Sequence, residues 1–367
     1  MRKLLFLFFL LLSLGGCISD FIPEVEGSQG VLVVDGMITN GESVIKLSRS
    51  VSIMDTLRGE NFIENAMVRI ERNDGVSFPA VHEGNGCYRI QTGDLNHALE
   101  YRLFFSVAGE SYQSDFLKPM RTAEIESISY RKKDREDPVG IFVSTYAEKD
   151  MSIYYRWSFK ETWELKASLF ARHGYINGVL TLFNRYTSNN TYYCWGRDSS
   201  KILILGSSEK LSDNVIKEQK LTEIPSSHDK ISILYHIEVS QMQIRKEAYD
   251  YFRILQDEIE RTGGLFNIVL SAGDNGNVYN CSKPDERVIG YVEVAETTMK
   301  SVFISNDETD FYNDPHEICP VYSHPGEGMF PWVDYDKVTY STWRCVDCRE
   351  RYNATKNKPS WWPTDHL

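Results

Sequence analysis

Two cysteines near the C-terminus have the spacing that most directly indicates chemistry. Cys345 and Cys348 are separated by two residues, as in disulfide frameworks, zinc sites and thiol redox pairs. Zinc would need two further ligands, for which Cys319 with His316 or His324 are candidates. A redox pair would need a strand-to-helix setting, which the charged flanking residues do not provide.

The other cysteines favour disulfides. Besides Cys17, six cysteines are present, and an even number is typical of pairing in an exported chain. We expect the pair near the C-terminus to staple the tail to the body, through Cys319 and one of Cys194 or Cys281, with the role of Cys87 left open. The disulfide candidates are Cys194, Cys281, Cys319, Cys345 and Cys348.

Acidic and aromatic residues alternate between residues 157 and 164. Glu161 and Glu164 beside Trp157 and Trp163 could provide the paired carboxylates and stacking rings of a glycoside hydrolase. On a strand, however, Trp157, Glu161 and Trp163 share one face. We therefore expect a buried aromatic row with one paired acid, and no catalytic residue here.

An acidic loop is the remaining candidate for metal binding. Asp310, Asp314, His316, Glu317 and His324 lie close together, and oxygen ligands could bind a cation. The register does not match a calcium-binding EF-hand loop, so we expect a solvated acidic loop with no metal and no cofactor. Nucleophile-elbow, His-Glu-x-x-His, phosphate-loop and dinucleotide motifs do not occur.

Aromatic residues gather towards the C-terminus. Aromatic side chains provide large contact areas at low entropic cost, so this group could form a ligand platform or a face for a partner protein. Terminal aromatic residues also anchor chain ends, and the sequence does not decide between these roles. The residues concerned are Trp332, Tyr335, Trp361 and Trp362.

The N-terminus has the features of an export signal. Arg2 and Lys3 precede an apolar run from Leu4 to Leu12, and Leu14-Gly15-Gly16-Cys17 has the order of a lipobox. The run is shorter than the ~20 residues of a membrane-spanning helix. We expect a signal peptide at 1–16, lipid on Cys17 that anchors the chain to a membrane, and a tether at 17–30.

The charge of the chain makes nucleic acid an unexpected partner. The formal charge is −12, and removal of the signal with its two basic residues makes it more negative. No basic block remains to neutralise phosphates.

Strand patterns dominate the rest of the chain, and we expect a mainly β fold. Short alternating segments, including a hairpin around Asn73-Asp74-Gly75, predict an immunoglobulin-like β-sandwich at 31–120. A connection near Pro119 to Pro138 leads to a larger β-rich domain at 138–367 with a disulfide-stapled tail.

One amphipathic helix is expected inside the second domain, at about residues 240–262. Ser240 with Gln243 resembles a capping box, and Gly263-Gly264 should end the helix. The spacing of five apolar residues predicts one buried face. These residues are Ile244, Ala248, Tyr251, Leu255 and Ile259.

Several of these segments together resemble the DUF4249 family of lipoproteins of the Bacteroidota. The resemblance extends from the lipobox to the tail, although Arg351-Tyr352-Asn353 stands where the family commonly has Gly-Gly. It rests on Val34-Asp35-Gly36-Met37-Ile38-Thr39-Asn40, Tyr154-Tyr155-Arg156-Trp157, Glu161-Thr162-Trp163-Glu164, Tyr193-Cys194-Trp195, Lys246-Glu247-Ala248-Tyr249, Gly276-Asn277-Val278, Val288-Ile289-Gly290-Tyr291, Cys345-Val346-Asp347-Cys348-Arg349 and Lys358-Pro359-Ser360-Trp361-Trp362.

The resemblance implies a place beside TonB-dependent outer-membrane receptors. We therefore expect a non-enzymatic, lipid-anchored outer-membrane protein, exposed at the cell surface, that helps such a receptor to capture or take up a nutrient. Two alternatives stay open: a surface hydrolase or metal-dependent enzyme, motivated by the carboxylate, His and Cys groups, and an adhesin or structural envelope protein, motivated by the expected sandwich.

Overall fold

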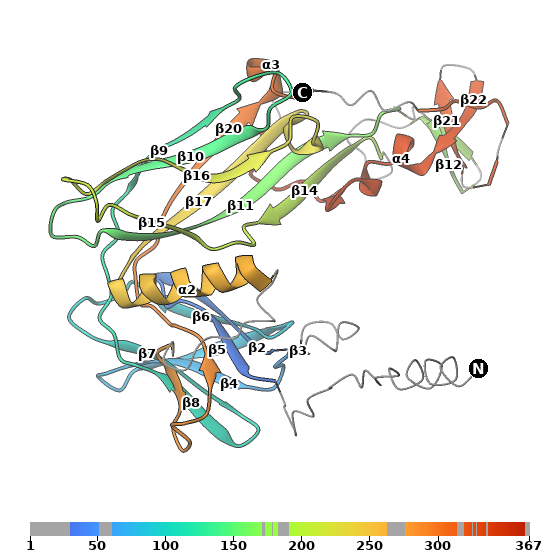
Figure 1. Cartoon of the computed structure of the whole chain (residues 1–367). Helices are drawn as coiled ribbons and strands as arrows, with labels where there is room; N and C mark the ends of the chain where they lie inside the picture. Colours follow the sequence, from blue (N-terminus) through green and yellow to red (C-terminus); the bar gives the residue numbers. More distant parts are fainter. Residues whose placement is uncertain are drawn as a thin grey trace, which may run out of the picture.

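The computed structural model of the chain is mainly β, as the sequence predicts. In Figure 1 the strands form two bodies with helix α2 between them and smaller hairpins at one end. None of the described helices is long and apolar enough to cross a membrane. Cys17, the expected signal peptide at 1–16 and the expected tether up to residue 29 lie outside the described residues. The structure describes residues 30–50, 61–170, 173–177, 179–182, 191–262, 276–313, 319–324, 326–327, 329–334 and 337–363.

A ten-stranded sheet forms the first body, in the order β18-β8-β7-β4-β5-β6-β2-β1-β19, with β3 paired to β2. The predicted hairpin between β4 and β5 is confirmed, and Gly75 in its turn has a φ of 91°, a conformation that favours glycine. The strands are β1 Leu32–Gly36, β2 Gly41–Arg49, β3 Asn61–Phe62, β4 Met67–Arg72, β5 Ser77–Gly84, β6 Cys87–Gly93, β7 Tyr101–Val107, β8 Glu110–Ser114, β18 Val278–Asn280 and β19 Val288–Ile289.

Strand β5 joins the two halves of this sheet. Pro79 pairs with β4, whereas Ala80 and the residues after it pair with β6. Alternate residues of β7, namely Tyr101, Leu103 and Phe105, are fully buried in a core that also takes side chains from β1, β2 and β6. The two halves of one continuous sheet therefore enclose the first core.

A late segment of the chain returns to the first body. Strand β18 pairs with β8, and β19 pairs in parallel with β1. Beyond β19, Val294 forms a bridge with Ile38, and Ala295 forms one with Met120. The segment is expected in the domain at 138–367, but its strands pair with the first sheet. The contacts are between residues more than 150 positions apart, so local patterns could not reveal them.

Two further sheets form the second body. A six-stranded sheet has the order β20-β17-β11-β14-β23, with β15 also paired to β11, and a three-stranded sheet has the order β16-β10-β9. Their buried side chains form the second core. The strands are β9 Ile125–Arg131, β10 Val139–Tyr146, β11 Tyr154–Lys166, β14 Tyr193–Ser199, β15 Ile204–Ser207, β16 Val215–Ile224, β17 Leu234–Ile244, β20 Thr298–Ser305 and β23 Ala354–Thr355.

Strand β11 lies at the centre of the second body. It pairs with β17 along most of its length, with β14 at its C-terminal half and with β15 at its N-terminal half. Trp157 and Trp163 point into the core and are almost completely buried. Each indole lies against a glycine of a neighbouring strand, Gly206 for the first and Gly196 for the second.

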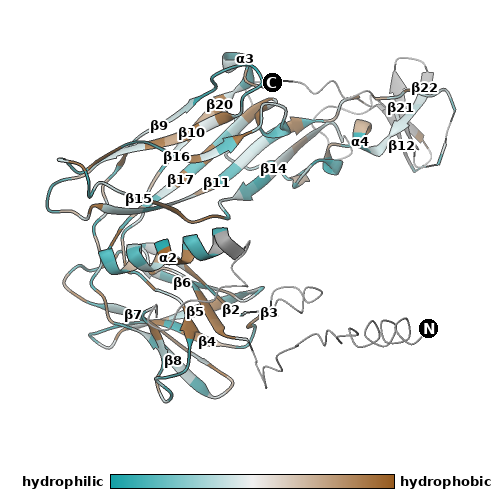
Figure 2. Ribbon diagram, viewed as in Figure 1, coloured by the Kyte–Doolittle hydropathy of each residue, from teal (hydrophilic) through white to brown (hydrophobic). Residues whose placement is uncertain are grey.

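Helix α2, Lys246–Thr262, packs between the two bodies. Ala248, Tyr251 and Leu255 are buried as predicted, in a cluster with residues of both bodies, and Figure 2 shows hydrophilic and hydrophobic stretches alternating along the helix. The predicted start near residue 240 is wrong, because β17 continues to Ile244. The predicted cap residue Ser240 is part of that strand.

The remaining described elements are short. Strand β12 pairs with β13, and β21 pairs with β22, in the hairpins at one end of the second body (Figure 1). These elements are η3 Asp229–Ile231, α3 Asn306–Thr309, α4 Trp343–Val346, η5 Cys348–Glu350, β12 His173–Ile176, β13 Val179–Leu182, β21 Met329–Asp334 and β22 Lys337–Thr342.

The contact between Trp163 and Gly196 gives a stability prediction. A Cβ at residue 196 would overlap Cε2 of Trp163, and the indole is fully buried, with little room to shift. Gly196→Ala should therefore lower the free energy of unfolding by about 1–3 kcal/mol, measured by urea denaturation. The control is Ser199→Ala at an exposed position of the same strand, where we expect a change within about 0.5 kcal/mol. Equal stabilities of the two variants would contradict the close packing.

Candidate functional site

Two disulfides fix the C-terminal tail. Cys194 in β14 is bonded to Cys348, with 5.6 Å between their Cα atoms, and Cys319 is bonded to Cys345, with 5.7 Å between theirs. The Cys-x-x-Cys pair is therefore neither a zinc site nor a redox pair. The predicted staple through Cys319 and one body cysteine is present, and the body cysteine is Cys194.

Cys281, the alternative partner, is not used. It is an exposed free thiol directly after β18, and its backbone N–H donates to Ser111 of β8 at 2.8 Å. This strand pair belongs to the first body, whereas the tail packs on the second. Cys87 is also a free thiol, in the first body. The prediction that Cys281 could form a disulfide is therefore wrong.

Beyond Cys348 the tail runs across the outer face of the six-stranded sheet. Strand β23 pairs with β14, and Trp362 then packs against Trp195 and Leu234. Trp362 is 3% exposed, and its Nε1–H donates to Oε2 of Glu164 at 2.8 Å. Its neighbour Trp361 stays 53% exposed. One tryptophan thus anchors the chain end and the other remains available for contact.

An open groove lies beside Trp361, with a volume of about 870 Å³. Its floor consists of residues on one face of three neighbouring strands. Lys160 of β11 stands opposite Ser199 and Glu238, and Thr162 stands opposite Arg197 and His236. The tail forms the rim. The residues around the groove are Lys160, Glu161, Thr162, Arg197, Asp198, Ser199, His236, Glu238, Pro359, Ser360 and Trp361.

Three neighbouring rings, which we call the aromatic rim, are Trp361, His236 and Phe303. Trp361 and His236 line the groove, and Phe303 lies next to His236 on the adjacent strand. The His236 ring lies 4.7 Å from Trp361 and 4.6 Å from Phe303, measured between centroids. Phe303, in β20, is 40% exposed. Burial lowers the pKa of His236, against a smaller opposing effect of the Glu238 charge, so the ring is neutral at pH 7. The aromatic rim can therefore stack against a flat apolar surface.

Charged side chains of both signs lie next to the aromatic rim. Lys160 and Arg197 provide donors, Glu238 provides an acceptor, and the hydroxyl of Ser199 can do either. Rings beside dispersed hydrogen-bonding groups can hold a polar ligand that also has an apolar face.

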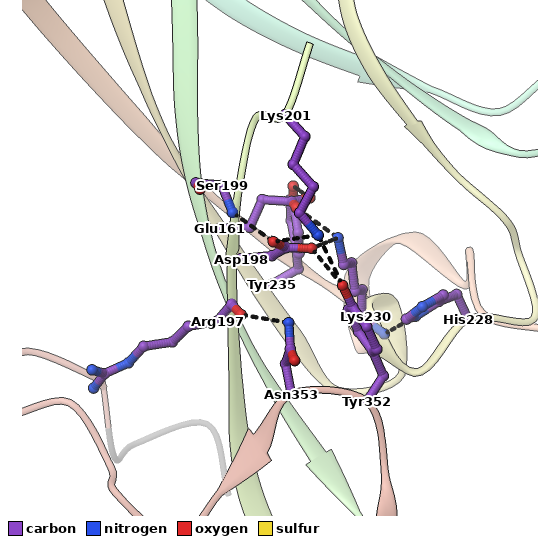
Figure 3. A network of polar contacts seen from close by, with 10 residues as sticks. All are labelled: Glu161, Arg197, Asp198, Ser199, Lys201, His228, Lys230, Tyr235, Tyr352 and Asn353. Atoms are coloured by element: carbon purple, nitrogen blue, oxygen red, sulfur yellow. Dashed lines mark hydrogen bonds and ion pairs between the residues drawn. The ribbon is translucent and has the colours of Figure 1, made fainter. Parts of the chain in front are cut away.

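A network of buried charges lies on the other face of the same strands (Figure 3). Glu161 accepts from Lys230 Nζ at 2.6 Å and from the Tyr235 hydroxyl at 2.6 Å. Lys230 lies 3.9 Å from Asp198, and Asp198 accepts from the Tyr352 hydroxyl of the tail at 3.2 Å. Glu161 is the paired buried acid that the sequence predicts. The network connects β11, β14, η3 and the tail, so its main effect is to hold the tail on the sheet.

The predicted aromatic face is described only in part. Trp332 belongs to β21 in the separate hairpin, although its side chain lies outside what the structure describes, and so does all of Tyr335. Of the two tryptophans of the described tail, Trp361 lines the groove and Trp362 does not. Sequence reasoning missed Lys160, Arg197 and His236 as groove residues. They alternate with buried residues along their strands, and this pattern could have placed them on the outer face of the sheet.

The acidic loop is described only in part. Asp310 ends helix α3 in a left-handed conformation, and residues 314–318, with Asp314, His316 and Glu317, lie outside the described residues. Among the described residues, no group of three His, Cys, Asp or Glu side chains could hold a metal ion.

The disulfides differ in the length of chain that they close. Cys194 and Cys348 are 154 residues apart, and Cys319 and Cys345 are 26 apart. Because a longer loop restricts the unfolded chain more, Cys194→Ala with Cys348→Ala should cost about 1.5 kcal/mol more stability than Cys319→Ala with Cys345→Ala. Guanidinium unfolding without reductant measures both. Equal losses would show that loop closure does not determine their contributions.

The environment of His236 gives a pH prediction. Its pKa is lowered in the folded protein, so the unfolded chain takes up a proton first as the pH falls below about 6.5. The free energy of unfolding should therefore decrease between about pH 7 and pH 5.5, and it should decrease less in His236→Phe, which keeps a ring but cannot titrate. Urea titrations at several pH values test this. Parallel curves for the two proteins would rule out the contribution of His236.

Comparison with known proteins places the chain in a family. It matches the family described as "Domain of unknown function (DUF4249)" over residues 18–301, and no curated protein matches it. The matched range begins directly after Cys17 and includes the strands of the groove floor, whereas the tail with Trp361 lies beyond it. Because this range covers most of the 367 residues, the chain belongs to the DUF4249 family.

Proposed function

We propose that this protein is a non-enzymatic outer-membrane lipoprotein of the Bacteroidota that works beside a TonB-dependent receptor in the capture or uptake of a nutrient. The observation that carries the proposal is the open groove with its aromatic rim. An exposed tryptophan held in place by a disulfide-anchored tail is suited to bind a ligand repeatedly without a large loss of conformational freedom.

The groove indicates the chemistry of the nutrient. Trp361 and Phe303 offer apolar ring surfaces, while Lys160, Arg197 and Glu238 surround them with charge. A ligand with many hydroxyl or amide groups and one flat apolar face would use both features. The volume of about 870 Å³ lies within the usual range for ligand sites of roughly 300–1,000 Å³.

The N-terminal segment supports the location. A signal peptide at 1–16 and lipid on Cys17 would attach the chain to the outer membrane, and the tether at 17–30 leads directly into β1 of the first body. In this proposal the first body is an immunoglobulin-like sandwich that acts as a spacer. It would hold the groove away from the membrane, on the external side of the cell.

Hydrolysis has weaker support than binding. A hydrolase would need a carboxylate free to donate or accept a proton at the ligand. Glu161 is instead 4% exposed and ion-paired to Lys230, and Asp198 is paired with Lys201. Glu238 on the groove floor is a single carboxylate and not the pair that glycoside hydrolysis uses. Adhesion is the other alternative, and it is distinguished from nutrient capture by the experiment below.

A pull-down from the native membrane in mild detergent, followed by mass spectrometry, tests the proposal. We expect a TonB-dependent barrel in stoichiometric amounts with the wild-type protein and with Trp361→Ala, and release of the protein from the membrane in Cys17→Ala. Growth on the nutrient should be impaired by Trp361→Ala, because its groove lacks a stacking surface. The matched control is Tyr146→Ala, which removes another exposed aromatic side chain, 59% exposed and outside the groove.

Three results would contradict the proposal. A protein that is recovered alone has no receptor as a stable partner. Cleavage of a glycan or peptide panel by the purified protein would favour the hydrolase. Loss of cell adhesion on deletion of the protein, with uptake unchanged, would favour the adhesin.

A further inference from the structure

A second, more enclosed cavity lies where the two bodies meet. Its volume is about 180 Å³, and its walls come from β1, β11, helix α2, residues 200–203 and the segment that follows β19. No residue lines both this cavity and the groove. The two come nearest along the chain at Ser199, which lines the groove, and Ser200, which lines the cavity. Nothing in the proposed nutrient-binding role requires it.

Arg156 provides an unsatisfied positive charge at this cavity. Its Nη1 is buried and has no hydrogen-bond partner, and its guanidinium lies 4.7 Å from the ring centre of Phe252. Burial lowers the pKa of Arg156, and the charge of Asp35 opposes this shift. A guanidinium stays protonated in proteins, so the charge remains on a partly exposed side chain whose Nη1 is shielded from water. Among the described residues, no carboxylate forms an ion pair with it.

The other cation at the cavity already has partners. Lys201 Nζ lies 3.3 Å from Asp198 and donates to the Tyr352 hydroxyl at 3.1 Å. Asp35 of β1 also lines the cavity, and its charge acts on Arg156 without forming an ion pair. Arg156 therefore keeps donor capacity that a ligand in the cavity could use. An unpaired buried charge is costly, and an anion within hydrogen-bond distance would remove much of this cost.

The remaining walls limit the shape of such an anion. Phe252, Leu255 and Leu203 provide apolar surface, and Tyr251 and Tyr291 are the aromatic residues with a hydroxyl. A cavity of ~150 Å³ with apolar walls accommodates benzene, so this one has room for a compact ligand of about that size. Inorganic phosphate would leave the apolar walls without contacts.

We propose that this cavity binds a small organic acid, with its carboxylate on Arg156 and its apolar part against helix α2. Because β1, β11 and α2 all line the cavity, the ligand contacts both bodies at once. Binding therefore stabilises their association, by an amount that grows with ligand concentration above the dissociation constant.

Calorimetry on the full-length protein in detergent tests this proposal, with benzoate and benzamide as probes. The two have nearly the same shape, but only benzoate is charged. We expect wild-type protein to bind benzoate at least tenfold more tightly than benzamide, and Arg156→Met to lose this preference. Arg197→Met, which removes a groove cation, is the matched control and should keep it. Benzoate should also raise the thermal midpoint of the wild type and the control, but not that of Arg156→Met.

Two further measurements separate a binding role from a structural one. Without ligand, Arg156→Met should unfold at the same or a higher denaturant concentration than the wild type, because it removes a charged group whose Nη1 is shielded and unpaired. Leu255→Phe keeps Arg156 but fills part of the cavity, and should weaken benzoate binding at least tenfold.

The proposal is overturned if the wild type fails to bind benzoate or binds benzamide equally well. It is also overturned if Arg156→Met keeps the preference, if Leu255→Phe binds benzoate normally, or if phosphate binds more tightly than benzoate. These outcomes do not bear on the groove, whose role is tested through Trp361.

Discussion

The two-residue period of strand β11 is the constraint on which the second body depends. Because successive side chains of a strand point to opposite faces, one set, with Trp157 and Trp163, enters the core, and the other, with Lys160 and Thr162, forms the floor of the groove. The same strand therefore carries the largest core side chains and the site. Glycines in the neighbouring strands leave room for the indoles, and the pair of Glu161 with Lys230 compensates for a charge on the buried face.

The outer face of this sheet also explains the course of the tail. Trp195 and Leu234 form an apolar row that needs cover, and Trp362 provides it. The hydrogen bond from its indole to Glu164 satisfies a polar group that the cover would otherwise bury. With Trp362 fixed and the Cys194–Cys348 bond behind it, Trp361 has to lie at the edge of the groove. The anchor and the contact surface are thus consecutive residues with opposite roles.

The two bodies are joined by more than a linker. The chain leaves the first body, builds most of the second, and returns through α2 to add β18 and β19 to the first sheet. Helix α2 buries side chains against both bodies. This arrangement packs the two bodies against each other through α2. It also encloses the cavity at Arg156, whose walls come from both bodies.

The sequence by itself determined the local elements. Alternation and turn residues located strands of the first body up to about Leu117, and the helical period identified Ala248, Tyr251 and Leu255 as the buried face of α2. The start of α2 was wrong, because Ser240 and Gln243 resemble a cap but belong to β17, where Gln241 accepts from the Trp157 indole at 2.8 Å. Trp361 could be singled out from its type, but not the residues opposite it, since the groove combines three strands and a tail that are distant along the chain. Which body cysteine bonds to the tail was likewise decided only by the tertiary structure. A disulfide needs two cysteines that are close in space, and their spacing along the chain does not give that distance.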